Sequence, residues 1–154
     1  MTNYNNSGAG RLVKAALALL VIFGASQSYA ACTQADLAGT WYMNGVSGNV
    51  WWGEFWETDF CKVRVNSEGK VRNSDSQCQV RDNLGKYTVD IAGGELTIAS
   101  SCLIKGKIQY CDGEACVNLK IDNGRLDKGK TVLTIVGRDS DNAFVTRFLT
   151  GVKK

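Results

Sequence analysis

The sequence predicts an all-β protein, an up-and-down antiparallel β-barrel of about eight strands, with a two-sheet β-sandwich as the alternative. From residue 38 onward, apolar residues recur at every second position in short segments bounded by glycine and polar residues. No part of this region shows a sustained helical period. The chain has 17 glycines and no proline, which suits a curved sheet, because proline removes a ladder donor whereas glycine eases bends and bulges. A meander of eight strands loses its exposed edges when it closes into a barrel.

Residues 1–30 have the features of a secretory signal peptide. Arg11 and Lys14 form a positively charged start, residues 15–25 are an apolar run, and residues 28–30 (SYA) form a small-x-small cleavage site. The run is shorter than the roughly 20 residues that a membrane-spanning helix needs. We therefore expect cleavage after Ala30, a secreted or periplasmic bacterial protein, and no stable membrane anchor after cleavage.

Residues 31–154 are expected to form a single barrel domain. The whole chain has 18 basic and 15 acidic residues. Without Arg11 and Lys14 the balance is 16 to 15, a net charge of +1, which offers no electrostatic footprint for nucleic acid. Histidine is absent, which removes the commonest general base and the commonest neutral metal ligand. We therefore expect no metal and no cofactor.

Six cysteines behind a secretory signal predict a disulfide framework. Antiparallel pairing about a polar turn at residues 66–69 brings Cys61 close to Cys78. The segment CDGEAC looks like a turn whose ends are clamped by Cys111 and Cys116. Elimination then leaves Cys32 with Cys102, and the three pairings stand as a hypothesis.

Glycine and polar residues mark the expected turns between strands. Tyr87, Val89 and Ile91 lead into Gly93-Gly94, and a two-residue primed turn there would place Ile91 opposite Leu96. Asn123-Gly124 is a second turn signal. The expected strands are residues 39–46, 60–65, 70–81 with a polar interruption at 73–77, 87–91, 96–98, 102–110, 117–121, 131–137 and 143–151.

Aromatic residues concentrate between positions 39 and 65, which hold all four tryptophans. Within residues 47–59, Trp51 is adjacent to Trp52 and Phe55 to Trp56, so no single face of a strand can collect these rings. We expect a long aromatic loop there, with these four residues as the candidate binding site. Two interpretations are open: the loop folds down to complete the core, or it exposes a patch that contacts an unknown protein, a glycan or a small apolar ligand.

Gly39-Thr40-Trp41, at the head of the first strand, resembles the Gly-x-Trp signature of lipocalins and their calycin relatives. Arg147, on the final strand, looks like the arginine that packs over that tryptophan. The chain is also similar to small bacterial secreted domains that begin with a Gly-x-Trp strand. The resemblance implies a barrel with a ligand cavity, and Trp41 closing the barrel bottom against Arg147, partly by cation–π stacking.

Function is therefore predicted as a binding or interaction module acting through the aromatic loop, and not as an enzyme. A lipocalin-like carrier is the alternative, and an internal void above about 300 Å³ would favour it. A filled interior with the tryptophans outside would favour surface recognition. A third hypothesis is a glycosidase-type enzyme using Glu54, Glu57 or Asp59, which requires two carboxylates to converge in a cleft.

Overall fold

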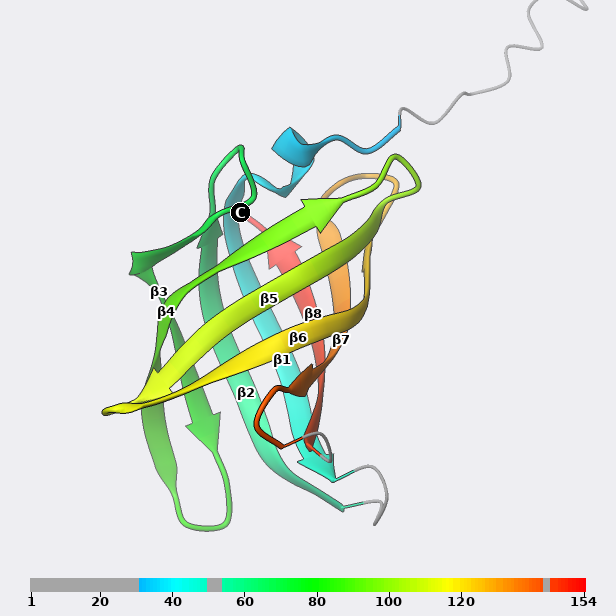
Figure 1. Cartoon of the computed structure of the whole chain (residues 1–154). Helices are drawn as coiled ribbons and strands as arrows, with labels where there is room; N and C mark the ends of the chain where they lie inside the picture. The colour runs from blue at the N-terminus through cyan, green and yellow to red at the C-terminus, as the bar shows by residue number, and fades with distance from the viewer. Residues whose placement is uncertain (1–30, 50–53, 143–144) are drawn as a thin grey trace, which may run out of the picture. The chain divides into compact units, whose positions relative to one another are not determined.

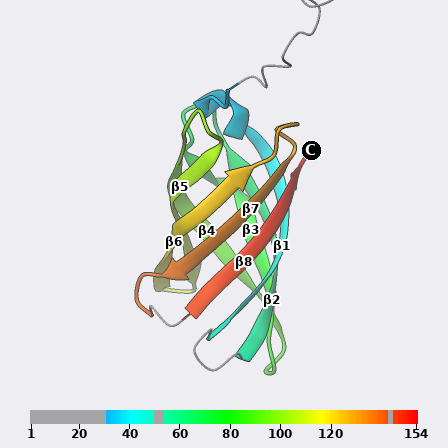
Figure 2. The ribbon, with the colours of Figure 1, turned by 90° about the vertical axis from the view of Figure 1, so that its right-hand side faces the viewer.

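The computed structural model describes residues 31–49, 54–142 and 145–154. Its eight antiparallel strands follow one another around a closed barrel, and the last strand pairs with the first (Figures 1 and 2). The predicted up-and-down barrel is confirmed, and the sandwich alternative is wrong. The strands are β1 (Gly39–Asn49), β2 (Glu54–Val65), β3 (Val71–Arg81), β4 (Lys86–Ile98), β5 (Leu103–Asp112), β6 (Ala115–Leu126), β7 (Val132–Asp139) and β8 (Val145–Lys153).

The barrel interior is lined by alternating apolar side chains, as the period-two pattern predicted. In β2, for example, Cys61, Val63 and Val65 are buried, whereas Lys62 and Arg64 are exposed. Successive side chains of a strand point to opposite faces, so closure of the sheet turns one face of every strand inward.

The predicted hairpin at Gly93-Gly94 is wrong, because β4 runs through both glycines as one strand paired with β5. Ile91 and Leu96 are both buried although an odd number of positions separates them. A register shift between Ile91 and Gly93 inserts one extra residue and restores the inward face. A bulge, and not a turn, therefore brings Ile91 and Leu96 to the same inner face of the barrel.

The predicted turn at Asn123-Gly124 is wrong for the same reason. Strand β6 continues to Leu126, with a register shift between Ile121 and Asn123 in its pairing with β7. The chain turns instead at residues 127–131, where the Asp127 carboxylate accepts hydrogen bonds from three backbone N–H groups.

Residues 47–59 are also not one long loop. Strand β1 extends to Asn49 and β2 begins at Glu54. Ser47 pairs with Glu57 and Gly48 with Phe55, so Trp56 is the extra residue of a bulge in β2. That bulge accounts for the break in alternation at Phe55-Trp56.

One end of the barrel, which we call the closed end, is covered by the 3₁₀ helix η1 (Gln34–Leu37) (Figure 2). Leu37 is fully buried, and its carbonyl accepts a hydrogen bond from Trp41 Nε1 at 2.8 Å. The Gln34 side-chain amide donates to the Leu96 carbonyl and accepts from the Ile98 N–H. No helix within the described residues has the length and hydropathy of a membrane span.

Three disulfides join the pairs favoured from the sequence, and each fastens a different part of the barrel. Cys61–Cys78 links β2 to β3, and Cys111–Cys116 links the ends of the β5–β6 hairpin. Cys32–Cys102 ties the segment before η1 to the β4–β5 connection, so it holds the cover of the closed end in place.

Candidate ligand-binding cavity

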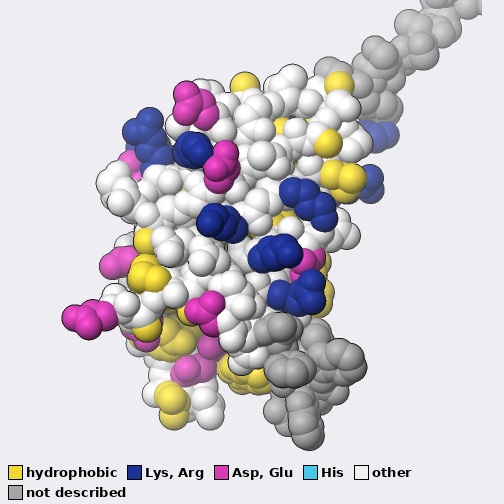
Figure 3. Space-filling view, viewed as in Figure 1, with side chains coloured by type: hydrophobic (Ala, Val, Ile, Leu, Met, Phe, Trp, Pro, Cys, Tyr) yellow, Lys and Arg dark blue, Asp and Glu magenta, His cyan; other side chains and the backbone are white. Residues whose placement is uncertain are grey.

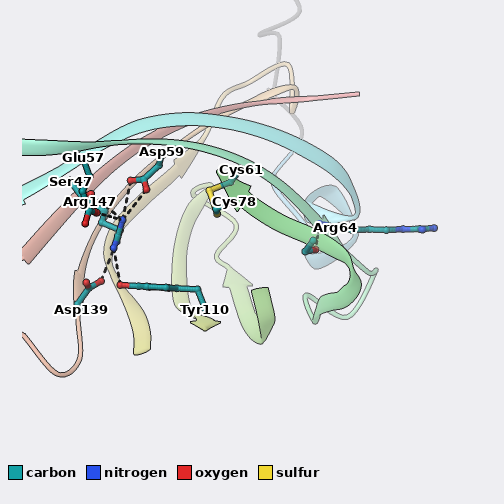
Figure 4. The surroundings of a disulfide bond; sticks show 10 residues. Ser47, Glu57, Asp59, Cys61, Arg64, Cys78, Tyr110, Asp139 and Arg147 are labelled. Carbon is teal, nitrogen blue, oxygen red and sulfur yellow. Dashed lines mark hydrogen bonds and ion pairs between the residues drawn. A yellow bond between two sulfur atoms is a disulfide. The ribbon is translucent and has the colours of Figure 1, made fainter. Parts of the chain in front are cut away.

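The barrel encloses a cavity of about 260 Å³ toward the end opposite η1, which we call the open end. At that end the chain makes its connections at residues 82–85 and 113–114. The cavity is bounded mainly by apolar side chains from six strands: Met43, Val63, Ile91, Ile108, Leu119 and Leu149. The Cys61–Cys78 disulfide forms part of the same wall (Figure 4).

Polar groups occupy one part of the cavity wall, with Arg147 at their centre (Figure 4). Its Nη1 donates to Glu57 Oε2 at 3.1 Å and to Asp59 Oδ1 at 2.9 Å. Its Nε donates to Asp139 Oδ1 at 3.3 Å, and its Nη2 donates to the Tyr110 hydroxyl at 3.0 Å. One cation is thus shared by three carboxylates, a group that we call the Arg147 cluster.

Strand register brings the Arg147 cluster together. Ser47 of β1 lies opposite Arg147 of β8 on one side and opposite Glu57 of β2 on the other. The three residues therefore form one row across three strands, and the Ser47 hydroxyl donates to Glu57 at 2.6 Å while accepting from Arg147 at 3.0 Å. Asp59, two residues beyond Glu57, points to the same inner face.

Burial and mutual charge shift the titration of this cluster. Burial raises the pKa of the Asp59 carboxyl above its ordinary value, although the Arg147 guanidinium opposes the shift. Burial alone would lower the pKa of Arg147, but the negative charges of Asp59, Asp139 and Glu57 outweigh it and hold the pKa above its usual range. Burial also raises the pKa of the Tyr110 hydroxyl. Arg147 therefore stays positively charged at any physiological pH.

The structure does not place Arg147 against Trp41, so the interaction that the lipocalin resemblance implied is wrong. Trp41 lies opposite Lys153 in the β1–β8 ladder, six positions from the row of Arg147, or about 20 Å along the strand. Lys153 takes the expected role: its Nζ lies 5.4 Å from the Trp41 ring centroid and donates to the Asp36 carbonyl. Arg147 instead lies over the Tyr110 ring at 4.7 Å. The burial of Trp41 at the closed end does agree with the expected plug.

The four aromatic site residues predicted from the sequence fall mostly beyond the described part of the structure. Trp51 and Trp52 lie outside the described residues, and only the backbone of Phe55 is described, within β2. Trp56 is 39% exposed on the outer wall of the barrel. Phe60, on the same strand, is 55% exposed. The described part of the predicted site therefore faces outward, away from the cavity.

Two of the three carboxylates considered for catalysis do come together. Glu57 and Asp59 both line the cavity and both accept hydrogen bonds from the same nitrogen of Arg147. Only the backbone of Glu54 is described. The pair meets the geometric condition of convergence, but each carboxylate is held by the guanidinium.

No protein-family model matches the chain, and no curated protein sequence is detectably similar to it.

Sequence reasoning did not find three polar residues of the cavity wall, Tyr87, Tyr110 and Asp112, or two residues that contact Arg147 behind it, Ser47 and Asp139. A signal was present for two of them. Tyr110 stands in the inward series of residues 102–110, and Tyr87 in the inward series that begins β4. Ser47 and Asp139 lie in segments that the sequence predicts to be loops. In a loop, alternation does not indicate which side chains point into the barrel.

Charge is unevenly distributed on the outer wall as well. Lys107 of β5 lies opposite Lys120 of β6, which lies opposite Arg138 of β7. All three are exposed, and basic side chains gather over β5 and β6 in the view of Figure 3. This cationic row was not visible in the net charge, which is close to balanced.

Proposed function

We propose that this protein binds a small, mostly apolar ligand inside its barrel, in the manner of a lipocalin-like carrier. The observation that supports this function best is the cavity of about 260 Å³ with an apolar wall and a few polar groups. Small-molecule sites have this composition, and their volumes begin near 300 Å³. The cavity is below that range and below the value of about 300 Å³ set from the sequence as favouring a carrier, so its composition supports the proposal and its volume does not. We therefore expect a ligand smaller than a typical drug molecule.

The two ends of the barrel differ in a way that suits a binding site. The closed end is sealed by η1, Leu37 and Trp41 and fastened by Cys32–Cys102. A ligand would therefore enter from the open end, where the cavity has its polar groups. Three disulfides are typical of extracellular or periplasmic proteins, and this compartment agrees with the predicted signal peptide at residues 1–30.

We propose binding in preference to catalysis because Glu57 and Asp59 both share Arg147. A glycosidase needs one carboxyl group as an acid and the other as a free nucleophile or base. Here both carboxylates accept hydrogen bonds from a permanent cation, which favours a structural charge cluster.

Titration with 1-octanol by isothermal calorimetry tests the proposed function. We expect saturable binding that Val89→Phe weakens at least about tenfold, because Val89 lines the cavity and the larger phenyl ring would project into the space that the ligand occupies. Thr88→Phe is the matched control, since Thr88 is exposed on the same strand. Equal binding by wild type and both variants would place the octanol elsewhere and contradict the proposal.

A second candidate is recognition of a partner or glycan on the outer wall, supported by the exposure of Trp56 and Phe60 on β2. Tryptophan fluorescence titrated against glycan mixtures tests it. We expect a response that Trp56→Phe removes and Val89→Phe does not.

A further inference from the structure

The described charges around the cavity and its mouth are strongly unbalanced. Glu57, Asp59 and Asp112 line the cavity, and Asp139 joins them through Arg147. A neighbouring depression shares Tyr87 and Asp112 with the cavity and adds Asp82 and Lys86. Five carboxylates therefore face two cations in the described residues of this region.

From this imbalance we infer that the ligand is an amphipathic amine, whose apolar body occupies the cavity and whose ammonium head lies among the carboxylates at the open end. The inference deepens the proposed function and depends on it. The cavity gives the place where the ligand binds, and the surrounding carboxylates favour a positively charged head group.

Arg147 is not placed to receive an anionic head instead. All three of its nitrogens already donate hydrogen bonds to Ser47, Glu57, Asp59, Asp139 or Tyr110. A carboxylate ligand that approached the remaining N–H of Nη2 would lie within reach of the three carboxylates that already surround Arg147. Burial of such a group among like charges is unfavourable.

Glu57 is the carboxylate best placed to meet an ammonium group. Its side chain is 16% exposed, so it is reachable from the open end. The hydrogen bonds from Ser47 and Arg147 both end on Oε2. Among the described residues, Oε1 has no donor, and an ammonium group carries three donors that could use it.

The pKa of the Tyr87 hydroxyl reflects the same excess of negative charge at the open end. Burial, followed by the charges of Glu57 and Asp82, raises the pKa of the Tyr87 hydroxyl to about 12. An organic cation fits this field better than a metal ion, because no group of three or more acidic, cysteine or histidine side chains in the described residues is arranged to hold a metal. The apolar wall requires an apolar body as well.

Three probes of equal chain length test the inference in calorimetric titrations at neutral pH: octylamine, 1-octanol and octanoate. Octylamine is cationic there, since alkylammonium groups resemble the lysine side chain with a pKa near 10. We expect octylamine to bind at least about tenfold more tightly than octanol, in line with a charge-assisted hydrogen bond, and octanoate to bind most weakly. Octanol binding equal to or tighter than octylamine binding, or preferential octanoate binding, overturns the amine inference and leaves the cavity function standing. Failure of all three probes overturns both.

Charge-neutralising variants locate the head group. Glu57→Gln and Asp112→Asn are expected to weaken octylamine binding about five- to tenfold and to leave octanol binding within twofold of wild type. Glu95→Gln is the matched control, because Glu95 lies toward the closed end in a surface ion pair with Lys70. Unchanged octylamine affinity in both mouth variants, with wild-type melting temperatures, overturns the placement of the ammonium group.

Discussion

Arg147 is the central charge of the polar part of the cavity, because its single guanidinium forms ion pairs with three carboxylates that are themselves largely buried. The exposed fractions are 11% for the Arg147 side chain, 3% for Asp59 and 9% for Asp139. Removing one partner of such a group leaves uncompensated buried charge, and this costs more than the intact cluster contributes.

Arg147→Met is therefore expected to lower the free energy of unfolding by about 3 to 5 kcal/mol at neutral pH. Arg64→Met is the control, since Arg64 forms an ion pair with Asp75 in which both side chains are largely exposed, and it should cost below about 1 kcal/mol. Urea unfolding measures both values. Equal effects of the two substitutions would contradict a buried, shared cation.

The Arg147→Met variant should also recover stability as the pH falls. Burial already raises the pKa of Asp59, and the substitution removes the cation that opposes this shift. The folded state then binds more protons than the unfolded state between the ordinary aspartate pKa and the raised one, so unfolding free energy falls as pH rises through that window. We expect the variant to be more stable near pH 4 than near pH 7, and a constant deficit across that range would rule out buried carboxylates as its cause.

At the scale of the strands, the Gly93-Gly94 pair of β4 directly follows a bulge and does not form a turn. The sequence correctly indicated that Ile91 and Leu96 share a face. The predicted way to achieve this was a turn at Gly93-Gly94, whereas the structure achieves it with one inserted residue. The choice depends on β5, which pairs with every residue of β4 from Gly93 to Ile98. That information lies outside the segment, so the local pattern could not supply it.

Gly94 and Gly93 allow a direct test of this bulge. Both have positive φ angles, near +149° and +154°, which disfavour a side chain. A Cβ on Gly94 would lie 2.4 Å from the Lys107 carbonyl oxygen, whereas a Cβ on Gly93 would meet nothing within 4 Å. Gly93→Ala should cost about 1 kcal/mol, and Gly94→Ala about 1 to 3 kcal/mol more. Thermal unfolding of the two variants measures the difference, and similar melting temperatures would argue for a hairpin turn at this position.

The cationic row across β5, β6 and β7 should weaken the sheet slightly. Like charges directly opposite each other are destabilising, and Lys120 has one on each side. Lys120→Glu is therefore expected to raise the free energy of unfolding by about 0.5 kcal/mol at low salt, with a smaller gain at high salt. Loss of stability in chemical denaturation at both salt concentrations would be inconsistent with this pairing.

For the whole molecule, closure of the barrel creates the site. Glu57 and Arg147 were each singled out from the sequence, but for unrelated roles. They meet because β8 pairs with β1, which places Arg147 beside Ser47, a residue 100 positions earlier. Local alternation was enough to predict most of the strands and which of their side chains point inward. It could not predict the register between strands that are far apart in the sequence.

The three disulfides should contribute to stability in the order of the loops that they close. Their sequence separations are 70 for Cys32–Cys102, 17 for Cys61–Cys78 and 5 for Cys111–Cys116. The chain-entropy relation gives about 4, 3 and 2 kcal/mol respectively. Paired replacement of each bridge by alanine, followed by urea unfolding, tests the ranking. A larger loss from the Cys111–Cys116 pair than from Cys32–Cys102 would contradict it.

The described chain enters and leaves the barrel at the closed end, where the Lys154 backbone N–H donates to the Thr40 carbonyl (Figure 1). A tether attached at Ala31 or at Lys154, the two ends of the described domain, would consequently project away from the cavity mouth. Surface-immobilised or fusion forms should keep their entrance facing the bulk solution, so a sensor chip coated through a terminal tag would leave the site accessible to analyte.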